Sequence, residues 1–451
     1  MSDVIAAVAT GAALSAIGIV RLSGDGAIEL SDALFRPRSG RPLRDCEPRS
    51  LIYGSLCSRA GELLDLCLCT ISRAPHSYTG EDTVEFQCHG SPVVLRTLLD
   101  ELFALGARQA LPGEFTKRAF LNGRMDLSSA EAVADLIDAE SAESAKNAAG
   151  QLAGALGART EGVYSALADI SAHYHAVLDY PDEDIEPFRL AAYEDALERA
   201  AAELRALLAT YGRGRLMNAG IPAAIIGRPN AGKSSLLNAL LGYERAIVTR
   251  VPGTTRDTIE EKLQLGGICL RLIDTAGLRE TDDEVERLGV ERSRSAMERA
   301  ELILAVVDGS EAPTPEDEAI LAAAEKAKRA IVVLSKKDLS EACALRTSLP
   351  VVKLSSVTGE GIAELCAAIE AMFPLPEVPA GGILTNARHA DAVSRALVSV
   401  EAALQAMREG ATPDLVLTES ETAMAALGEL DGRTVREDVT ERIFSRFCVG
   451  K

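Results

Sequence analysis

The sequence predicts a multidomain protein of the α/β and α classes. Short apolar runs broken by Gly, Pro and Ser turns fill residues 1–120, which is typical of a strand-rich α+β domain. Apolar residues spaced three and four apart then indicate amphipathic helices of a bundle. Strands alternate with helices from about Ile221 to Pro374, and helical periodicity resumes afterwards. We therefore expect an α/β domain inserted into a helical one.

Four apolar runs carry the prediction for the N-terminal domain: Ile17–Leu22, Leu51–Leu56, Leu64–Ile71 and Thr83–Phe86. The pattern changes near Asp126, where Ser128 and Glu131 have the spacing of a capping box and predict the start of a helix.

Three longer runs predict the bundle helices: Val163, Leu167, Ile170, Tyr174 and Val177; Leu197, Ala201, Leu204, Leu208 and Tyr211; and His389, Val393, Leu397, Val400, Leu404 and Met407. The acidic segment 180–187 between the first two runs is interpreted as a solvated loop. The predicted domains are 1–121, 122–219 with 376–451, and the inserted 220–375.

Composition excludes several classes of protein. A net charge of −20 argues against broad, nonspecific binding to nucleic acid or anionic lipid. No run of 18 uncharged apolar residues and no basic leader occurs, so we expect a soluble protein and no membrane partner. Nine cysteines, an odd number without CxxC pairs, indicate a reducing, cytoplasmic setting and structural thiols rather than a metal site. Cys67 and Cys69 are expected on one face of a strand.

The strongest motif lies at the start of the inserted domain. An apolar strand precedes Gly227–Ser234, which matches GxxxxGKS/T, and an amphipathic helix follows. Loop amides and the helix N-terminus face phosphates in such a loop. Lys233 is expected to reach the β- and γ-phosphates, and the Ser234 hydroxyl to bind Mg²⁺.

Further elements follow in the order expected of a Ras-like GTPase. A threonine of the segment 253–257 could complete the Mg²⁺ shell, and Asp274 could orient it. The Asp338 carboxylate would accept from guanine N1 and N2, which selects GTP over ATP. The expected GTP-binding residues are Asn230, Ala231, Gly232, Lys233, Ser234, Ser235, Thr249, Arg250, Val251, Pro252, Gly253, Thr254, Thr255, Asp274, Thr275, Ala276, Gly277, Lys336, Asp338, Ser355, Ser356 and Val357.

Two positions depart from related GTPases. Ser335 stands where asparagine usually ties the base loop to the phosphate loop, so we expect GTP selectivity with lowered affinity. Leu278 follows DTAG and cannot orient a water molecule, so another group must do so; Glu284 and Glu286 lie just downstream.

The motifs GRPNAGKSSLLN, PGTTRD, DTAGLRE, SYTGEDTVEFQCHG and the terminal FCVGK together resemble the tRNA-modification GTPase MnmE (TrmE) family over the whole chain. The resemblance implies an N-terminal dimerisation domain similar to tetrahydrofolate-binding enzymes. It implies a GTPase that forms GDP and phosphate, depends on K⁺ and is activated when two G domains of a homodimer pair. With MnmG, an FAD protein in a heterotetramer, such a protein helps to add an aminomethyl or carboxymethylaminomethyl group at C5 of wobble uridine in certain tRNAs.

The resemblance also assigns site residues. K⁺ would be bound by Asn230, Thr249, Val251 and Thr254, Mg²⁺ by Ser234 and Thr255, and the catalytic residues would be Glu286 and Lys233. A 5-formyl- or methylene-tetrahydrofolate would be bound by Arg21, Glu81, Arg124 and Lys451. Arg250 stands where acidic residues are common, and the Pro-Pro-Gly usual before Arg21 is missing. The role of His89 stays open.

The terminal FCVGK resembles a lipidation signal, but Gly450 and Lys451 do not fit a prenylation box. The preceding ERIFSRF predicts a helix that places Cys448 at its end. By resemblance, Cys448 is a candidate for tRNA modification, either as a nucleophile or as a supporting residue.

Two other functions compete with this one. A ribosome-assembly type of regulatory GTPase would use similar nucleotide motifs but usually carries an RNA-binding appendage. A folate-dependent one-carbon transferase with an incidental G domain is disfavoured by the intact nucleotide motifs.

Overall fold

The structure, a computed structural model, describes residues 3–11, 13–179, 190–243, 261–265, 268–273, 297–339, 342–374, 378–435 and 437–450. It divides into two compact units, one made of 1–134, 151–197 and 398–451 and the other of 135–150 and 198–397. Four helices supply residues to both units: α4 (Leu127–Ile137), α5 (Ala142–Leu152), α7 (Leu190–Ala209) and α14 (Ala387–Arg408). The fold is multidomain, α/β and α, as the sequence predicts.

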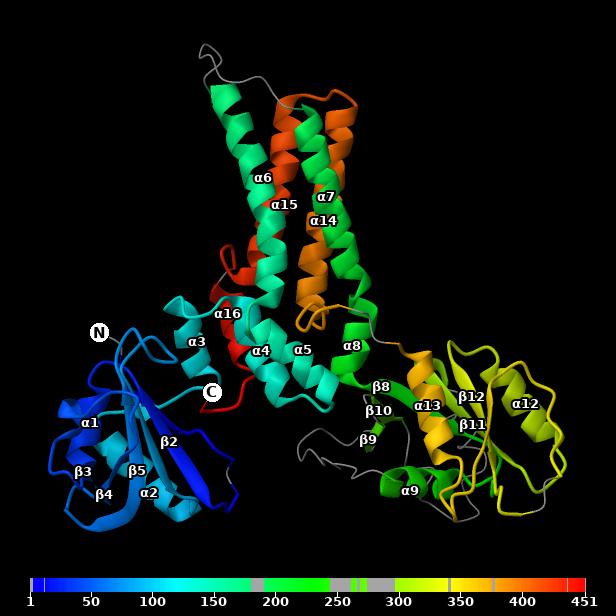
Figure 1. Cartoon of the computed structure of the whole chain (residues 1–451), viewed down its shortest axis with the longest axis horizontal. Helices are drawn as coiled ribbons and strands as arrows, with labels where there is room; N and C mark the ends of the chain where they lie inside the picture. Colours follow the sequence, from blue (N-terminus) through cyan, green and yellow to red (C-terminus); the bar gives the residue numbers. More distant parts are fainter. Residues whose placement is uncertain are drawn as a thin grey trace. The chain divides into compact units, whose positions relative to one another are not determined.

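The first unit contains a seven-stranded sheet with the strand order β3-β4-β5-β6-β2-β1-β7. Strands β2, β3, β4 and β5 of this sheet are labelled in Figure 1. The strands are β1 (Ile5–Val8), β2 (Ile17–Ser23), β3 (Phe35–Pro37), β4 (Ile52–Cys57), β5 (Leu63–Ser72), β6 (Thr83–His89) and β7 (Arg108–Gln109). All neighbours are antiparallel except β1 and β7. Helices α1 (Ala27–Leu34) and α2 (Pro92–Ala104) bury apolar residues such as Ile28 and Leu98 against the inward-facing strand residues. The 3₁₀ turn η1 spans Leu43–Asp45.

Helices complete the first unit. α6 (Ala155–Asp179) runs beside α15 (Pro413–Asp431), whereas α3 (Glu114–Leu121) contacts α16 (Glu437–Phe444). Phe444 and Phe447 pack with Leu127 and Ala130 in a small apolar cluster. This cluster anchors the end of the chain beside the N-terminal domain.

The second unit contains a six-stranded sheet with the order β13-β12-β11-β8-β10-β9 (Figure 1). The strands are β8 (Ile221–Ile226), β9 (Glu261–Leu265), β10 (Ile268–Leu272), β11 (Leu302–Asp308), β12 (Ala330–Ser335) and β13 (Val351–Lys353). Only β9 and β10 are antiparallel. Among the described residues, the helices that lie wholly within this unit are α8 (Tyr211–Ala219), α9 (Lys233–Tyr243), α12 (Pro315–Ala324) and α13 (Ile362–Met372). The carboxyl ends of β8, β11, β12 and β13 share one edge, where open α/β sheets bind ligands.

Two local predictions need correction. Ser128 does not begin a capping box, because α4 starts at Leu127 and the Asp126 carboxylate accepts from the Ser129 backbone N–H at 2.6 Å. The aspartate is preferred because its short carboxylate reaches the amide three residues on. The run 197–211 is also not one helix, since α7 ends at Ala209 and α8 begins at Tyr211. The segment 180–187 lies outside the described residues.

None of the helices in the described part of the chain is both long enough and apolar enough to span a membrane.

Candidate nucleotide-binding site and N-terminal pocket

The phosphate-binding loop joins β8 to α9. Five of the six β8 side chains are buried, which fixes the strand in the centre of the sheet. The loop then takes left-handed conformations at Asn230 (φ 62°) and Gly232 (φ 99°). Asparagine and glycine are the residues that tolerate this geometry. The turn brings Lys233 to the first position of α9, so the helix N-terminus and the loop share one concave surface.

Lys233 is the central cation of this loop. Its Nζ donates hydrogen bonds of 2.8 Å to the carbonyl oxygens of Gly227 and Arg228. Burial lowers the pKa of Lys233, and the nearby Glu316 opposes that shift. A partly desolvated ammonium group in this position interacts more strongly with an anion than one in bulk water. Ser234 and Ser235 are exposed at the same end of the helix.

Asp308 is a residue of this edge that the sequence analysis missed. It ends β11, is 3% exposed, and accepts a 2.6 Å hydrogen bond from Lys336 Nζ. Burial raises its pKa, but the bonds from Lys336 and Ser310 outweigh burial and lower it overall. The Arg228 guanidinium lies 4.0 Å away and also pairs with Glu311 at 2.5 Å. The sequence signal that could have identified Asp308 is an acidic residue directly after a run of apolar strand residues.

Ser335 links the two nucleotide loops. Its hydroxyl donates to the Ala231 carbonyl oxygen at 2.6 Å and lies 3.2 Å from the Val307 carbonyl oxygen. The shorter side chain therefore still reaches the phosphate loop, which weakens the reason for expecting a lower affinity than asparagine would give.

Asp338, predicted to recognise the base, is held by a residue that follows the neighbouring strand β13. Its carboxylate accepts a 2.6 Å hydrogen bond from the Ser355 hydroxyl. The same oxygen of Ser355, which is fully buried, accepts from the backbone N–H groups of Val357 and Thr358 at 3.3 and 3.2 Å. Lys336 has φ 57°, which turns the chain sharply between β12 and Asp338. The segments 336–338 and 355–357 are thus brought together as predicted.

The remaining predicted nucleotide and ion residues lie outside the described residues: Thr249, Arg250, Val251, Pro252, Gly253, Thr254, Thr255, Asp274, Thr275, Ala276, Gly277 and Glu286. Lys451, predicted for folate, does so as well.

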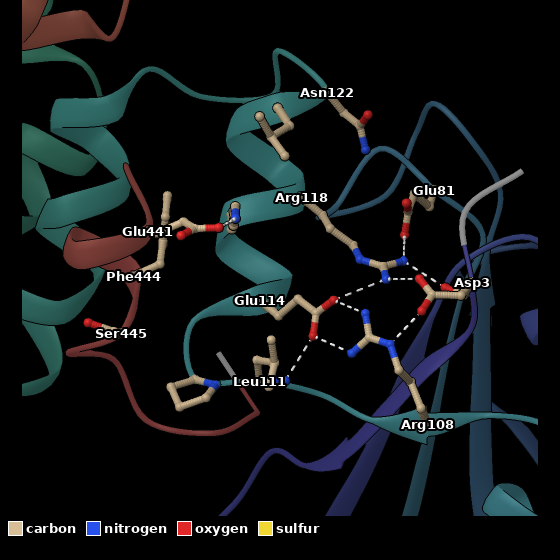
Figure 2. Close-up of a pocket in the computed structure, with 13 residues that line it drawn as sticks. Asp3, Glu81, Arg108, Leu111, Glu114, Arg118, Asn122, Glu441, Phe444 and Ser445 are labelled. Carbon is tan, nitrogen blue, oxygen red and sulfur yellow. Dashed lines mark hydrogen bonds and ion pairs between the residues drawn. The ribbon is translucent and has the colours of Figure 1, made fainter. Parts of the chain in front are cut away.

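The first unit contains a pocket of about 630 Å³ between α3 and α16 (Figure 2). Its lining residues are Asp3, Glu81, Arg108, Leu111, Pro112, Glu114, Lys117, Arg118, Leu121, Asn122, Glu441, Phe444 and Ser445. The positively charged side chains of this pocket form ion pairs with its carboxylates. The Arg118 guanidinium donates to Glu81 at 2.9 Å and to Glu114 at 3.2 Å. Arg108 donates to the other Glu114 oxygen at 2.8 Å.

The predicted folate residues take different places around this pocket. Glu81 lines it and also accepts from the Ser23 hydroxyl at 2.7 Å. Arg21 does not line it; this side chain pairs with Glu85 at 2.7 Å, and its guanidinium lies over the Tyr78 ring at 5.6 Å. Arg124 lies beside the turn at Gly80, where a Cβ atom would come within 3.3 Å of the Arg124 Cγ, and it is also absent from the lining. Arg118 was not predicted from the sequence, but it is an arginine that lines the pocket, the place expected for Arg21 and Arg124.

The end of the chain is docked rather than frayed. Val449 forms an antiparallel bridge with Pro112, and the Gly113 N–H donates to the Cys448 carbonyl oxygen at 3.3 Å. Gly450 has φ 96°, and a Cβ there would lie 2.2 Å from the Val8 carbonyl oxygen. Only glycine fits so close to that strand. The Cys448 residue is exposed at this junction.

Comparisons with known proteins agree with these features. The model of the MnmE helical domain matches residues 127–448, and that of the GTP-binding protein TrmE N-terminus matches residues 4–124. The tRNA modification GTPase MnmE of Symbiobacterium thermophilum is 42% identical, with 100% of this chain aligned to 99% of that one. The protein of the same name from Roseiflexus sp. (strain RS-1) is 43% identical over the same shares of the two chains.

Among solved structures, the G domain of the T. maritima FeoB iron transporter is 27% identical over 34% of this chain and 97% of that chain. Its TM-score is 0.24, which is too low to support a structural argument. The two family models and the full-length relatives cover both units of the fold. The chain belongs to the tRNA modification GTPase MnmE family.

Proposed function

We propose that this chain hydrolyses GTP to GDP and phosphate, and that the cycle drives modification of tRNA. The observation that carries the proposal is the Asp338–Ser355 pair beside the phosphate loop. A carboxylate fixed at 2.6 Å by a buried hydroxyl is oriented to accept from guanine N1 and N2. The finer product, an aminomethyl or carboxymethylaminomethyl group at C5 of wobble uridine made with MnmG, rests on the family resemblance.

The phosphate end of the site would work through charge. Lys233 would exchange its two loop carbonyls for β- and γ-phosphate oxygens, and the α9 amides would donate to the same group. The hydroxyls of Ser234 and Thr255 fit the oxygen ligands that Mg²⁺ prefers. Bound there, Mg²⁺ would neutralise charge on the β- and γ-phosphates.

Hydrolysis would also need residues of the segments 249–254 and 278–286. Glu286 would position the attacking water, since Leu278 cannot. The exposed Asn230 side chain, with Thr249, Val251 and Thr254, supplies oxygen ligands suited to K⁺, whose charge would replace an arginine finger. Pairing of two G domains in a homodimer would complete this arrangement.

The pocket between α3 and α16 supports a proposal for the ligand of this domain. Glu81 would accept from ring donors, whereas Arg108, Lys117 and Arg118 are paired with pocket carboxylates and would have to exchange those partners for anionic groups of a ligand. We propose a tetrahydrofolate derivative, 5-formyl or methylene, as the ligand of the N-terminal domain, bound near Arg21, Glu81, Arg124 and Lys451. Cys448, held at the same junction by Val449, would then lie close to the one-carbon chemistry.

The domain assignments stay part of this proposal: 1–121 for folate binding and dimerisation, 122–219 with 376–451 for the helical domain, and 220–375 for the G domain. A ribosome-assembly role is not favoured, because the full-length relatives carry the tRNA modification name.

Mass spectrometry of wobble nucleosides tests the proposal. A deletion strain should lose the C5 modification, the intact gene should restore it, and a Lys233→Ala gene should not. A wobble uridine whose modification state is unchanged on deletion would reject tRNA modification. Accumulation of immature ribosomal subunits with normal nucleosides would favour the regulatory alternative.

A further inference from the structure

The N-terminal sheet contains a second group of reactive side chains, none of which lines the pocket between α3 and α16. Asp65, Cys67 and Cys88 each offer one ligand atom, and these atoms all lie within 4.8 Å of one another. It is the one such group of three or more metal-ligating side chains in the described part of the chain. Both cysteines are buried, at 4% and 1% exposure.

Strand pairing creates this group from positions far apart in the sequence. Along β5, Asp65 and Cys67 point to the same face, because successive side chains alternate. β5 pairs with β6 in an antiparallel register in which Leu68 faces Gln87, so Cys67 and Cys88 form the next cross-strand pair. Their sulfur atoms lie within 4.8 Å of one another. A search for CxxC spacing misses such a pair, since its two thiols come from different strands.

Asp65, the third member of the group, is held in place by His89. Its two carboxylate oxygens accept from the His89 backbone N–H at 2.8 Å and pair with His89 Nδ1 at 2.7 Å. The Asp65 side chain is 9% exposed, whereas that of His89 is 75% exposed. Oδ1 also accepts from the Leu66 backbone N–H at 2.7 Å, so Oδ2, which accepts only from the His89 N–H, is the oxygen with a lone pair left for a metal ion. Carboxylates that bind metal ions in proteins are themselves held by hydrogen bonds from outer partners, as His89 holds Asp65 here.

We propose that Asp65, Cys67 and Cys88 bind one thiophilic d¹⁰ cation, with Zn²⁺ as the expected ion and a fourth position open toward the exposed His89. Two thiolates and a carboxylate are ligands of tetrahedral Zn²⁺. With Zn–S bonds of about 2.3 Å, the two sulfurs would lie about 3.8 Å apart. The observed atoms therefore need shifts of about 1 Å or less to enclose the ion. Binding breaks both S–H bonds and releases the two protons to solvent.

Cys69 provides a matched control on the same strand face. It is fully buried, like the two proposed ligands, but its cross-strand partners are Ile52 and Phe86. Cys69 is not a member of the metal-ligating group. Replacing this thiol removes a buried cysteine of the same strand without removing a proposed ligand.

The experiment uses the full-length chain with Cys448→Ser in every sample, so that the exposed thiol does not bind metal. Protein reduced with a phosphine and freed of metal with a chelator is titrated with Co²⁺, whose thiolate charge-transfer absorption reports sulfur ligation. Zn²⁺ competition and elemental analysis then give affinity and stoichiometry. We expect about one ion per chain in the parent and in Cys69→Val, no charge-transfer band in Cys67→Val or Cys88→Val, and at least tenfold weaker binding in Asp65→Asn.

X-ray absorption of the Zn²⁺-loaded parent needs no core substitution. It therefore tests sulfur ligation of the ion even where a variant fails to fold. Two sulfur neighbours with oxygen or nitrogen completing the shell support the site. A shell without sulfur overturns it, as does a parent that takes up no Co²⁺. Intact-mass analysis of unreduced protein that shows a Cys67–Cys88 disulfide, two hydrogens lighter, also overturns it.

Discussion

The Ser335 hydroxyl donates a 2.6 Å hydrogen bond to the Ala231 carbonyl oxygen, which ties the end of β12 to the phosphate loop. Both residues are buried, at 2% and 0% exposure. The two loops that we propose to hold opposite ends of a nucleotide are thus joined by a buried hydrogen bond. Removing the donor leaves a buried acceptor without a partner, and this costs more free energy than the hydrogen bond itself contributes.

Ser335→Ala should therefore weaken nucleotide binding. The Ala231 carbonyl would keep no donor from this side chain, and the phosphate loop would lose part of its preorganisation. We expect affinity for GDP to fall about tenfold, equivalent to about 1.4 kcal/mol, in isothermal titration calorimetry. Ser348→Ala, which removes an exposed hydroxyl of the same unit, is the control. Equal dissociation constants for the parent, Ser335→Ala and Ser335→Asn proteins would show that the link does not affect binding.

Asp338→Asn should lower affinity for guanine nucleotides more strongly. Hydrogen bonds to a charged group contribute about 1.5–3 kcal/mol each, so a loss of at least tenfold is expected. Because the amide can donate to an oxygen at the 2-position, xanthine nucleotides should bind better than in the parent. Ser355→Ala removes the 2.6 Å bond that orients Asp338 and should give a smaller loss for guanine with no gain for xanthine. Fluorescent-nucleotide competition measures all three.

Sequence reasoning recovered the parts of the fold that depend on local periodicity. The four predicted apolar runs correspond to β2, β4, β5 and β6, and the bundle runs to α6, α7 and α14. The nucleotide motifs also carry their own context, because a strand, a glycine turn and a helix are contiguous in sequence. Asp338 and Ser355 could be assigned to one site since both follow strands of a parallel sheet.

The rest of the site depends on register and on long-range pairs. Arg118 reaches Glu81 across 37 positions, and Lys336 reaches Asp308 across 28, neither of which a spacing rule predicts. Arg21 and Arg124, the two arginines that the resemblance assigns to folate, lie outside the pocket lining. Their positions, too, depend on contacts between residues far apart in the sequence. Charged side chains can be recognised in a sequence, but their partners cannot.

Glu114→Gln should destabilise the first unit at neutral pH and much less in acid. Burial raises the pKa of Glu114, but hydrogen bonds from Arg108, the Leu111 N–H and Arg118 outweigh it and lower the pKa overall. A lowered folded pKa gives stability that is complete above the ordinary glutamate range and is lost as the pH falls through the folded pKa. We expect a difference of about 1–3 kcal/mol from the parent at neutral pH in denaturant unfolding, closing in acid. Glu47→Gln, which replaces an exposed carboxylate of the same unit, is the control, and a difference that grows in acid would contradict the sign.

Glu286→Ala should abolish GTP turnover and preserve nucleotide binding. The role assigned to this carboxylate is to position water, which acts on the chemical step and not on the ground-state complex. Phosphate release in K⁺ should fall to the background of the assay, while the dissociation constant for GDP stays within twofold of the parent, an expected change of about 0.4 kcal/mol or less. Glu284→Ala, from the same acidic segment, is the matched control. Retained K⁺-stimulated turnover in Glu286→Ala would remove the assignment.

Cys448→Ser should leave GTP hydrolysis intact and lower tRNA modification, because the exposed thiol lies in the first unit beside the N-terminal domain and not in the nucleotide site. Modification is read by nucleoside mass spectrometry, and full modification by the variant would make the tail a bystander.

Gly450→Ala tests whether docking of the tail matters separately from the thiol. A methyl group there would meet the Val8 carbonyl oxygen at 2.2 Å, so the bridge between Val449 and Pro112 should open. We expect faster amide exchange at the tail and lower tRNA modification, with the thiol still present. Gly106→Ala is the control, since that glycine also has a positive φ (111°) but no atom within 4 Å of its Cβ position. If the tail amides of Gly450→Ala exchange no faster than those of Gly106→Ala, the added methyl group does not open the tail. The positive φ alone would then explain why glycine stands at position 450. If the tail opens while modification stays complete, docking is not needed for the chemistry, and Cys448 would act from a mobile segment or not at all.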